Sequence, residues 1–432
     1  MLSQQDNALL CEVEPGTPMN TALARYWFPA LPAHMVAQHG CDPVRARLLG
    51  RDYVINRDHE GQLAILDEKC CHRGASLCLA RNEVGGLRCI YHGWKFAVDG
   101  RLVETPNAKG DYAQRYRQPA GKARAAANVI WVYLGPAAAE PPFPQLPFLD
   151  LPDAHVVVQE VFIDANFVQV MEGLVDSSHL GFLHRDSITA SLKDQQTGDD
   201  ATYRQMLEDL SPRVEVEETG FGFHYAALRE IVSQGKSVTS ARITAFALPF
   251  FDFTPNNTTM MATVPVDTHR TLLFEFNWDW DAPIGPELRD KILAFHGIGN
   301  DVLDRLGLSR ATYAGLGAAG QLAGFIQNRA AMRSGDSFTG LPNFLPEDVA
   351  VCLSMGSMTD RSRENLVPAD QAVVRLRRVL LQAARGEAAL AEPGWVPRAL
   401  QGELAAGEDW NTLPQRRSEW RKSFGKFSST KK

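Results

Sequence analysis

The stretch that decides the fold is DEKCCHRGASLCLARNEVGGLRCIYHGWKF, residues 67–96, which holds four of the seven cysteines of the chain. Within it, Cys70-x-His72 and Cys89-x-x-His92 form two short Cys/His pairs, separated by sixteen residues. Each pair falls in an expected loop between short strands. Thiolates and imidazoles bind zinc or an iron–sulfur cluster. The stretch therefore predicts one metal site with two sulfur and two nitrogen ligands.

The order of the ligands distinguishes between these metals. Structural zinc sites usually pair Cys with Cys and His with His along the sequence. Here Cys and His alternate, as in a Rieske [2Fe–2S] centre, where two cysteines hold one iron and two histidines hold the other. The order favours a Rieske cluster, and zinc remains the alternative.

The segments CCHRGASL and CIYHGWKF resemble the two cluster loops of Rieske proteins. The resemblance implies that Cys70 and Cys89 are the sulfur ligands and that His72 and His92 are the nitrogen ligands of a [2Fe–2S] cluster.

Three neighbouring positions refine this resemblance. Cys71 stands where the family commonly has proline, and we interpret Cys71 and Cys78 as buried thiols. Tyr91 stands where respiratory Rieske proteins have a disulfide-bonded cysteine. The module therefore resembles the oxygenase type.

A second motif lies in NFVQVMEGLVDSSHLGFLH, residues 166–184, which predicts a helix. Asp176 and His179 are three apart and share a helix face, whereas His179 and His184 are about 140° apart on an ideal helix. We therefore expect the helix to distort or end near Gly181. Two isolated histidines would otherwise be interpreted as core or surface residues.

This segment resembles the E-x-x-x-D-x-x-H-x-x-x-x-H stretch of Rieske non-haem iron oxygenases, matched from Glu172 to His184. The resemblance implies that His179, His184 and a later carboxylate hold Fe(II) and leave positions for O₂. The segment 336–366 resembles the region that supplies this carboxylate in the phthalate dioxygenase branch, and there we predict Asp348. The alternatives are Asp336, Glu347 and Asp360, since an acidic residue in a proline-bounded turn is often a cap.

The resemblance also implies a role for Asp176 and an assembly. The matching aspartate connects an iron histidine to a Rieske histidine of the neighbouring subunit and fixes the histidine tautomer. Asp176 would join His179 to His92 or His72 across an interface. The implied assembly is a head-to-tail homotrimer or two stacked trimers.

Around these motifs the sequence predicts an α+β protein of two domains. Alternation at 44–66, the Asp99-Gly100 hairpin signal and NVIWVYLG predict a small all-β unit that ends near Gly135. With an N-terminal arm it forms the expected Rieske domain over 1–140. A proline-rich linker at 135–147 leads into a catalytic domain over 141–432. Long strands at 213–228, 240–253 and 259–280 and helices at 286–306 and 369–386 predict an antiparallel sheet covered by helices, of helix-grip type. A basic tail ends the chain at 416–432.

Composition excludes several classes of partner. The net charge of −7 and the pI near 5.9 give no general attraction to nucleic acid or anionic membranes. The N-terminal residues lack the pattern of a secretory signal and no apolar run is long enough to span a bilayer, so we expect a cytoplasmic protein. An odd number of cysteines argues against a disulfide framework.

Substrate residues are predicted from the phthalate dioxygenase-like branch, which PGTPM, RYWFPA and MGSMTDRSRENL also resemble. Many members of the branch act on aromatic carboxylates, which arginine can bind bidentately. In SARITAFALPFF, strand alternation places Arg242 among apolar side chains, where either a substrate carboxylate or an internal acidic residue could be its partner. Further candidates for substrate contacts are Ser177, Arg204 and Arg213, whereas Arg229 is interpreted as structural.

The resemblance therefore implies the oxygenase component of a dioxygenase that cis-dihydroxylates an aromatic carboxylate of phthalate, isophthalate or chlorobenzoate type. It would use O₂ and NADH-derived electrons from a separate flavin and iron–sulfur reductase. The enzymatic alternative is an O-demethylase or monooxygenase of a methoxylated aromatic acid. The alternatives without catalysis are a Rieske electron carrier with a binding domain and a zinc-binding interaction protein.

Overall fold

The structure is a computed structural model that describes residues 2–110, 112–194, 200–233, 235–255, 258–313, 327–387, 400–405, 407–411 and 413. The chain forms two compact units. The N-terminal unit comprises Glu12–Asp153 with Val264–Thr268, and the catalytic unit comprises the remaining residues. Met1–Cys11 thus group with the catalytic unit, whereas the sequence placed them in a domain over 1–140. The expected basic tail at 416–432 lies outside the described residues.

The N-terminal unit is built from three small antiparallel sheets. Its strands are short because polar and glycine turns interrupt the alternating sequence. At the predicted hairpin, Gly100 adopts φ +81° and donates its N–H to the Ala97 carbonyl. A short helix, α2 (Pro18–Leu23), precedes the sheets, which are β1 (Trp27–Pro32) with β10 (Val129–Tyr133) and β9 (Lys122–Ala126); β2 (Val44–Leu48), β3 (Arg51–Arg57) and β4 (Leu63–Asp67); and β5 (Arg81–Glu83), β6 (Gly86–Arg88), β7 (Lys95–Phe96) and β8 (Leu102–Glu104).

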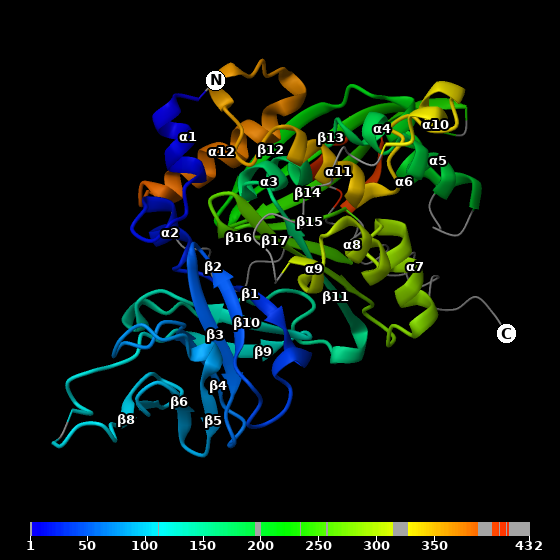
Figure 1. Cartoon of the computed structure of the whole chain (residues 1–432). Helices are drawn as coiled ribbons and strands as arrows, with labels where there is room; N and C mark the ends of the chain where they lie inside the picture. The colour runs from blue at the N-terminus through cyan, green and yellow to red at the C-terminus, as the bar shows by residue number, and fades with distance from the viewer. Residues whose placement is uncertain are drawn as a thin grey trace. The chain divides into compact units, whose positions relative to one another are not determined.

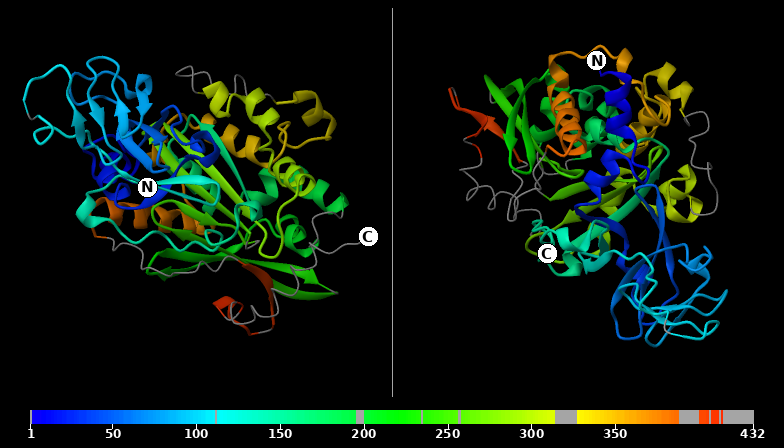
Figure 2. Two further views of the ribbon diagram at one scale, coloured as in Figure 1. Left: turned by 90° about the horizontal axis from the view of Figure 1, so that it is seen from below. Right: turned by 90° about the vertical axis from the view of Figure 1, so that its left-hand side faces the viewer.

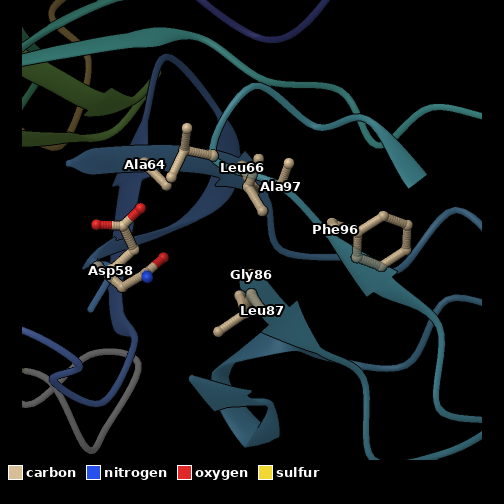
Figure 3. A pocket seen from close by; sticks show the side chains of 9 residues that line it. Asp58, Ala64, Leu66, Gly86, Leu87, Phe96 and Ala97 are labelled. Carbon is tan, nitrogen blue, oxygen red and sulfur yellow. The ribbon is translucent and has the colours of Figure 1, made fainter. Parts of the chain in front are cut away.

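A narrow seam, too small to hold a water molecule, lies between these strands, and Figure 3 shows it from close by. Leu66, Leu87 and Phe96 line it, and the same side chains pack against Cys70 and Cys89 in one hydrophobic cluster. The seam therefore lies within the packing that supports the two Cys/His loops.

The catalytic unit contains one large antiparallel sheet of eight strands. The region 213–228, expected as one long strand, is a hairpin that turns before Gly222. In order across the sheet the strands are β11 (Val156–Ile163), β17 (Arg270–Trp278), β16 (Thr259–Asp267), β15 (Phe251–Phe253), β14 (Lys236–Ala247), β13 (Gly222–Ser233) and β12 (Arg213–Thr219), and β18 (Leu400–Leu404), red in Figure 2, pairs with β14.

The two faces of this sheet differ in chemistry because successive side chains of a strand point to opposite faces. One face, at Leu228, Ala241 and Ile243, packs against Leu400, Leu404 and Trp410 in an apolar cluster. We call the opposite face the inner face. It carries Tyr225, Arg242, Thr244, Phe246 and Asp252, as the strand registers show.

Helices from distant parts of the sequence pack together on the catalytic unit. Helix α12 contacts β12 and β13, and α1 lies beside it although the two helices come from opposite ends of the chain (Figures 1 and 2). The fully buried Arg361 binds Glu172 of α3 bidentately at 2.8 and 2.9 Å. The helices are α1 (Gln4–Cys11), α3 (Phe167–Val175), α4 (Leu180–Leu183), α5 (Arg185–Asp194), α6 (Asp200–Glu208), α7 (Pro286–His296), α8 (Asn300–Leu306), α9 (Arg310–Tyr313), α10 (Arg329–Ser334), α11 (Phe344–Ser354) and α12 (Gln371–Ala384).

None of the helices in the described part of the chain combines the length and apolar character needed to cross a bilayer. All seven cysteines are described, and all are free thiols, in agreement with the sequence argument against a disulfide framework.

Candidate active site

The two Cys/His loops of the N-terminal unit have the same backbone pattern. The Cys70 N–H donates to the Ala75 carbonyl, and the Cys89 N–H donates to the Trp94 carbonyl five residues on, both at 2.9 Å. In each loop a glycine with φ near +75° donates back to the cysteine carbonyl: Gly74 at 2.8 Å and Gly93 at 3.0 Å. A left-handed φ favours glycine because it has no Cβ. The matched turns give both cysteines the same place in their loops, whereas the histidine follows the cysteine by two residues in one loop and by three in the other.

The four predicted ligands form two separate pairs. Cys70 and Cys89 are buried, and the His72 and His92 rings are half-buried with their centroids 4.5 Å apart. Burial and the neighbouring Cys89 thiol raise the pKa of Cys70 to about 12. Among the described residues, no three of these four bring their ligand atoms within 4.8 Å of one another. A single zinc ion would need all four that close, whereas a two-iron cluster takes one pair on each iron.

Side chains outside the pairs hold the loops in place. Gln118 is fully buried, accepts from the Cys71 N–H at 2.8 Å and donates to the Asp67 and Lys69 carbonyls. The Trp94 ring stacks on His72, with centroids 4.4 Å apart. The sequence analysis missed both residues, although Trp94 lies within the opening stretch.

The thiol predictions of the sequence analysis need one correction. Cys71 is exposed, not buried, and its backbone N–H is held by the buried Gln118 side chain. Cys78 is partly buried and packs against the hydrophobic cluster around Cys70 and Cys89.

In the second motif the helix breaks earlier than the sequence predicted. Helix α3 ends at Val175, and Asp176 has extended backbone at φ −91° and ψ 117°. Asp176 and His179 therefore do not share a helix face. The turn α4 follows, and Gly181 packs so closely that a Cβ there would lie 2.1 Å from the Met206 carbonyl oxygen. Gly181 thus permits close packing against α6 and is not the position of the break.

This break brings three predicted ligands together. The Asp348 Oδ1 atom lies 3.1 Å from His184 Nε2 and 3.6 Å from His179 Nε2. Ligands at right angles about an ion that is about 2.1 Å from each would be roughly 3 Å apart. Asp348 comes from the second turn of α11, a helix and not the proline-bounded turn that the sequence suggested. Two imidazoles and one carboxylate at these distances fit a facial triad.

Two further carboxylates contact the outer nitrogens of the histidines. Glu347 accepts from His184 Nδ1 at 2.8 Å and is itself held by the Thr339 hydroxyl. Asp176 Oδ2 lies 3.5 Å from His179 Nδ1, and its other oxygen accepts from Ser178. A carboxylate in this position fixes the tautomer, so that Nε2 points at the metal.

The other acidic residues considered as iron ligands do not occupy the ligand position. Glu347 acts through His184, and its neighbour Asp348 faces both Nε2 atoms. Asp336 accepts from Ser334, and Asp360 caps a short 3₁₀ turn. The outer role of Glu347 was missed because no local spacing relates it to His184, which lies 163 residues away.

The electrostatics of this site favour a cation. Burial would lower the pKa of His184, but the Asp348 and Glu347 carboxylates outweigh it and raise this pKa to about 9. Burial opposes ionisation of Asp348 and Asp176, yet the histidines hold both carboxyl pKa values below their usual range. The carboxylates thus favour positive charge at this position, and a bound divalent metal ion would supply that charge in place of the His184 proton.

Replacing Glu347 by alanine is expected to weaken iron binding at this site by about 10- to 100-fold, because His184 loses the acceptor that orients it. Glu347→Gln retains an acceptor oxygen and should lose less. Competition with a chelator, followed by iron analysis, measures the affinity. The exposed Asp336→Ala is the matched control; equal affinities in Glu347→Ala and the control would contradict this role.

Three of the predicted substrate residues have partners within the chain. Ser177 is buried, and its hydroxyl and carbonyl oxygens accept from Arg229, whose Nη2 lies 2.6 Å from the carbonyl. This supports the structural interpretation of Arg229. Arg204 pairs with Glu208 at 3.0 Å. Arg213 pairs with Glu215, and the register places it opposite Leu228, on the face away from Arg242, so it is not a candidate.

Arg242 differs from these residues because it has no ion-pair partner among the described residues. It is half-buried on the inner face, and its Nη1 lies 3.5 Å from the hydroxyl of the buried Thr244. In the described part of the chain, no carboxylate lies within 4.0 Å of its guanidinium group. The sequence allowed two partners for Arg242, a substrate carboxylate or an internal acidic residue. The second is not found among the described residues.

Comparison with known proteins extends this picture to the whole chain. Residues 26–118 match the Rieske [2Fe-2S] domain, and residues 132–426 match the family described as LigXa C-terminal domain like. The oxygenase subunit of phthalate 4,5-dioxygenase from Pseudomonas putida is 35% identical, covering 96% of this chain and 91% of that protein. The oxygenase subunit of 3-chlorobenzoate-3,4-dioxygenase from Comamonas testosteroni is 31% identical, covering 97% and 99%.

Two other similarities are more distant. A 5,5'-dehydrodivanillate O-demethylase oxygenase subunit from Sphingobium is 32% identical over 53% of each chain. The oxygenase of carbazole 1,9a-dioxygenase, solved as a complex with its ferredoxin, has a TM-score of 0.54 and 18% identity, covering 86% of this chain and 92% of that one. At that identity the match shows the fold.

The chain belongs to the Rieske non-haem iron ring-hydroxylating oxygenases, as a large subunit of the phthalate dioxygenase-like branch. Membership brings the cofactors of the family: a Rieske [2Fe–2S] cluster and a mononuclear iron that uses O₂. It excludes the zinc-binding interaction protein, and the α+β fold predicted from the sequence is confirmed.

Proposed function

We propose that this chain is the oxygenase component of a dioxygenase that cis-dihydroxylates an aromatic carboxylate of phthalate, isophthalate or chlorobenzoate type. The observation that carries the substrate class is the Arg242 guanidinium on the inner face, which has no carboxylate partner among the described residues. A buried or half-buried cation without a partner is costly, and a substrate carboxylate would supply that partner. The names of the two relatives that align over nearly the whole chain support the same class of acids.

We assign the cofactor ligands from the donor sets. Cys70, Cys89, His72 and His92 hold the cluster, and His179, His184 and Asp348 hold the mononuclear iron. When bound, these groups supply single electrons and the activation of O₂. The protein contributes the rest: Glu347 and Asp176 hold the histidines in the required tautomer, and the inner face orients the ring.

Asp176 is proposed to connect the two centres between subunits. Its carboxylate contacts His179 Nδ1, and its side chain is 23% exposed, so a second group can approach it. We propose that this group is His72 or His92 of a neighbouring subunit, in a homotrimer or a pair of stacked trimers. Oxygenase subunits of this kind work with a ferredoxin or reductase, and we propose a flavin and iron–sulfur reductase that uses NADH.

Turnover of candidate acids tests the reaction. Phthalate isomers, chlorobenzoates and methoxybenzoates would be supplied with O₂, NADH and a surrogate reductase, and the products separated by mass spectrometry. We expect cis-dihydrodiols carrying both atoms of labelled O₂. Formaldehyde released without a diol would support the alternative O-demethylase, which the more distant O-demethylase relative makes worth testing.

Substitution of Arg242 by glutamine is expected to raise KM for carboxylated substrates by about 10- to 100-fold, the loss of roughly 1.5–3 kcal/mol of charge-assisted hydrogen bonding. Arg242→Lys should be intermediate because it keeps the charge but not the planar fork. Initial rates with acid concentration varied measure KM. The control is Arg213→Gln, on the opposite face of the sheet. An unchanged KM in Arg242→Gln would remove Arg242 from substrate binding.

A further inference from the structure

Three buried polar side chains of the inner face lack a well-formed hydrogen bond in the described part of the chain. Both carboxyl oxygens of Asp252 and the Thr263 hydroxyl have no partner there, and the Tyr225 hydroxyl has at most a weak contact with Thr244. The side chains are at most 3% exposed. Nearly all buried polar groups in proteins are hydrogen-bonded, so three exceptions near one another require an explanation.

The strand registers place all three groups on the face that carries Arg242. Tyr225 of β13 lies opposite Thr244, two residues along β14 from Arg242. Asp252 of β15 lies opposite Phe246 of β14 on one side and Met261 of β16 on the other. Thr263 is two residues beyond Met261 and therefore shares its face. The three groups border the inner face across four adjacent strands.

Burial and the nearby Arg242 have opposite effects on the carboxyl group of Asp252. Burial raises the pKa of its carboxyl well above the usual range, and the opposing effect of Arg242 does not reverse this. Burial likewise raises the pKa of Tyr225 to about 12, against the influence of Arg242. Burial thus favours the uncharged forms of Asp252 and Tyr225 on the face that carries the Arg242 guanidinium group. Asp176 also acts on Tyr225, which places this cluster within electrostatic reach of the iron site.

Arg242 and Asp252 lie on one face without a direct bond between them. In the described part of the chain, the carboxyl group of Asp252 has no ion-pair or hydrogen-bond partner. Arg242 and the residue opposite Asp252, Phe246, are four positions apart, or about 13 Å along the strand, with Thr244 between them on the same face. A ligand that has one aromatic ring and a polar group at each end is long enough to contact both side chains.

We propose that Asp252 is a specificity-determining residue, whose carboxyl group hydrogen-bonds an oxygen substituent of the bound ring on the side away from the carboxylate that Arg242 holds. The O–H of Asp252 donates, and the acceptor is a second carboxylate, a methoxyl or a hydroxyl oxygen. The part of this proposal in which Arg242 binds the substrate carboxylate rests on the proposed function. Tyr225 and Thr263 offer further hydroxyls beside the same substituent.

Binding to the intact holoenzyme under nitrogen tests the proposal. Calorimetry would compare benzoate, which has no second oxygen, with isophthalate and 4-methoxybenzoate. The wild type is expected to bind at least one oxygen-substituted acid about 10-fold more tightly than benzoate. Asp252→Leu should abolish this ratio and leave the Kd for benzoate within about twofold, whereas Asp252→Asn, which keeps an N–H donor, should retain most of it. An unchanged ratio in Asp252→Leu would overturn the proposal.

A second measurement needs no substrate. Because the folded-state pKa of Asp252 lies above its unfolded value, the stability that its neutral form allows is lost as pH rises between these two values. Asparagine does not titrate, so the melting temperature of Asp252→Asn relative to that of the wild type should rise as pH increases above the unfolded-state pKa of about 4. The exposed Asp281→Asn is the control. A difference in melting temperature that does not change with pH would mean an ionised Asp252 and would overturn the proposed donor.

The two proposals can fail separately. If the wild type binds none of the acids, the proposed substrate class is wrong. The comparison is then made with anisole against toluene, which differ in one ether oxygen and carry no carboxylate. A preference for anisole that disappears in Asp252→Leu would support the role of Asp252, and a preference that persists would contradict it.

Discussion

Replacement of His179 by alanine is expected to remove the mononuclear iron and abolish oxygenation, while the Rieske cluster remains. His179 supplies one of three ligand atoms, which all lie within 4.8 Å of one another. The iron content should fall from about three per chain to about two, since a cluster holds two and the facial triad one. Iron analysis and the visible spectrum of the reduced and oxidised protein measure the two centres independently.

The exposed His269→Ala is the control for this substitution. This experiment also tests the electron carrier with an appended binding domain, which requires only the cluster iron. An iron content near two in the wild type, unchanged in His179→Ala, would reject the mononuclear centre in this chain.

The second large effect is expected from Asp176→Asn. Both iron centres should be retained, because Asp176 contacts His179 on the side away from Asp348. Turnover should nevertheless fall by at least 10- to 100-fold, since asparagine cannot keep a charged contact with His179 and a histidine of the next subunit. Iron analysis, the rate of cluster reduction and the rate of product formation separate these effects. A turnover equal to that of the exposed control Asp360→Asn would contradict the connecting role.

Mixed assemblies distinguish a connection between subunits from a local effect on His179. Chains carrying His92→Ala lack a complete cluster, and chains carrying His179→Ala lack the mononuclear site. Each variant alone should be inactive. Co-expressed chains should recover part of the activity if electrons pass from one subunit to the next, and adding Asp176→Asn to the His92→Ala chains should remove that recovery. Co-assembled but inactive mixtures would contradict transfer between subunits.

The Rieske loops were predictable from the sequence because all their information is local. Cys70 and His72 are two residues apart, and Cys89 and His92 are three apart, so each pair occupies one turn. The hairpin at Gly100 and the strand character of the catalytic sheet follow from equally local patterns. The helix break was misplaced because Gly181 suggested an end, although its missing Cβ serves packing against α6.

The roles of the carboxylates around the iron histidines do not follow from local patterns of this kind. Asp348 was predicted by resemblance, and its neighbour Glu347 was one of three alternatives because adjacent acidic residues look alike in a sequence. Their separation depends on the orientation of α11, which points Asp348 at two Nε2 atoms and Glu347 at His184 Nδ1. A rotation of that helix by one residue, about 100°, would exchange them.

By itself, the sequence determined that this protein has two metal centres. The Cys/His pairs and the two iron histidines are short-range motifs, so each can be recognised within one short stretch of the chain. Only the tertiary structure decided which carboxylate joins the histidines, which arginine lacks an internal partner, and that Asp252 shares a sheet face with Arg242. The physical reason is that burial, strand register and the absence of a partner depend on residues brought together from distant parts of the chain. No local pattern carries that information.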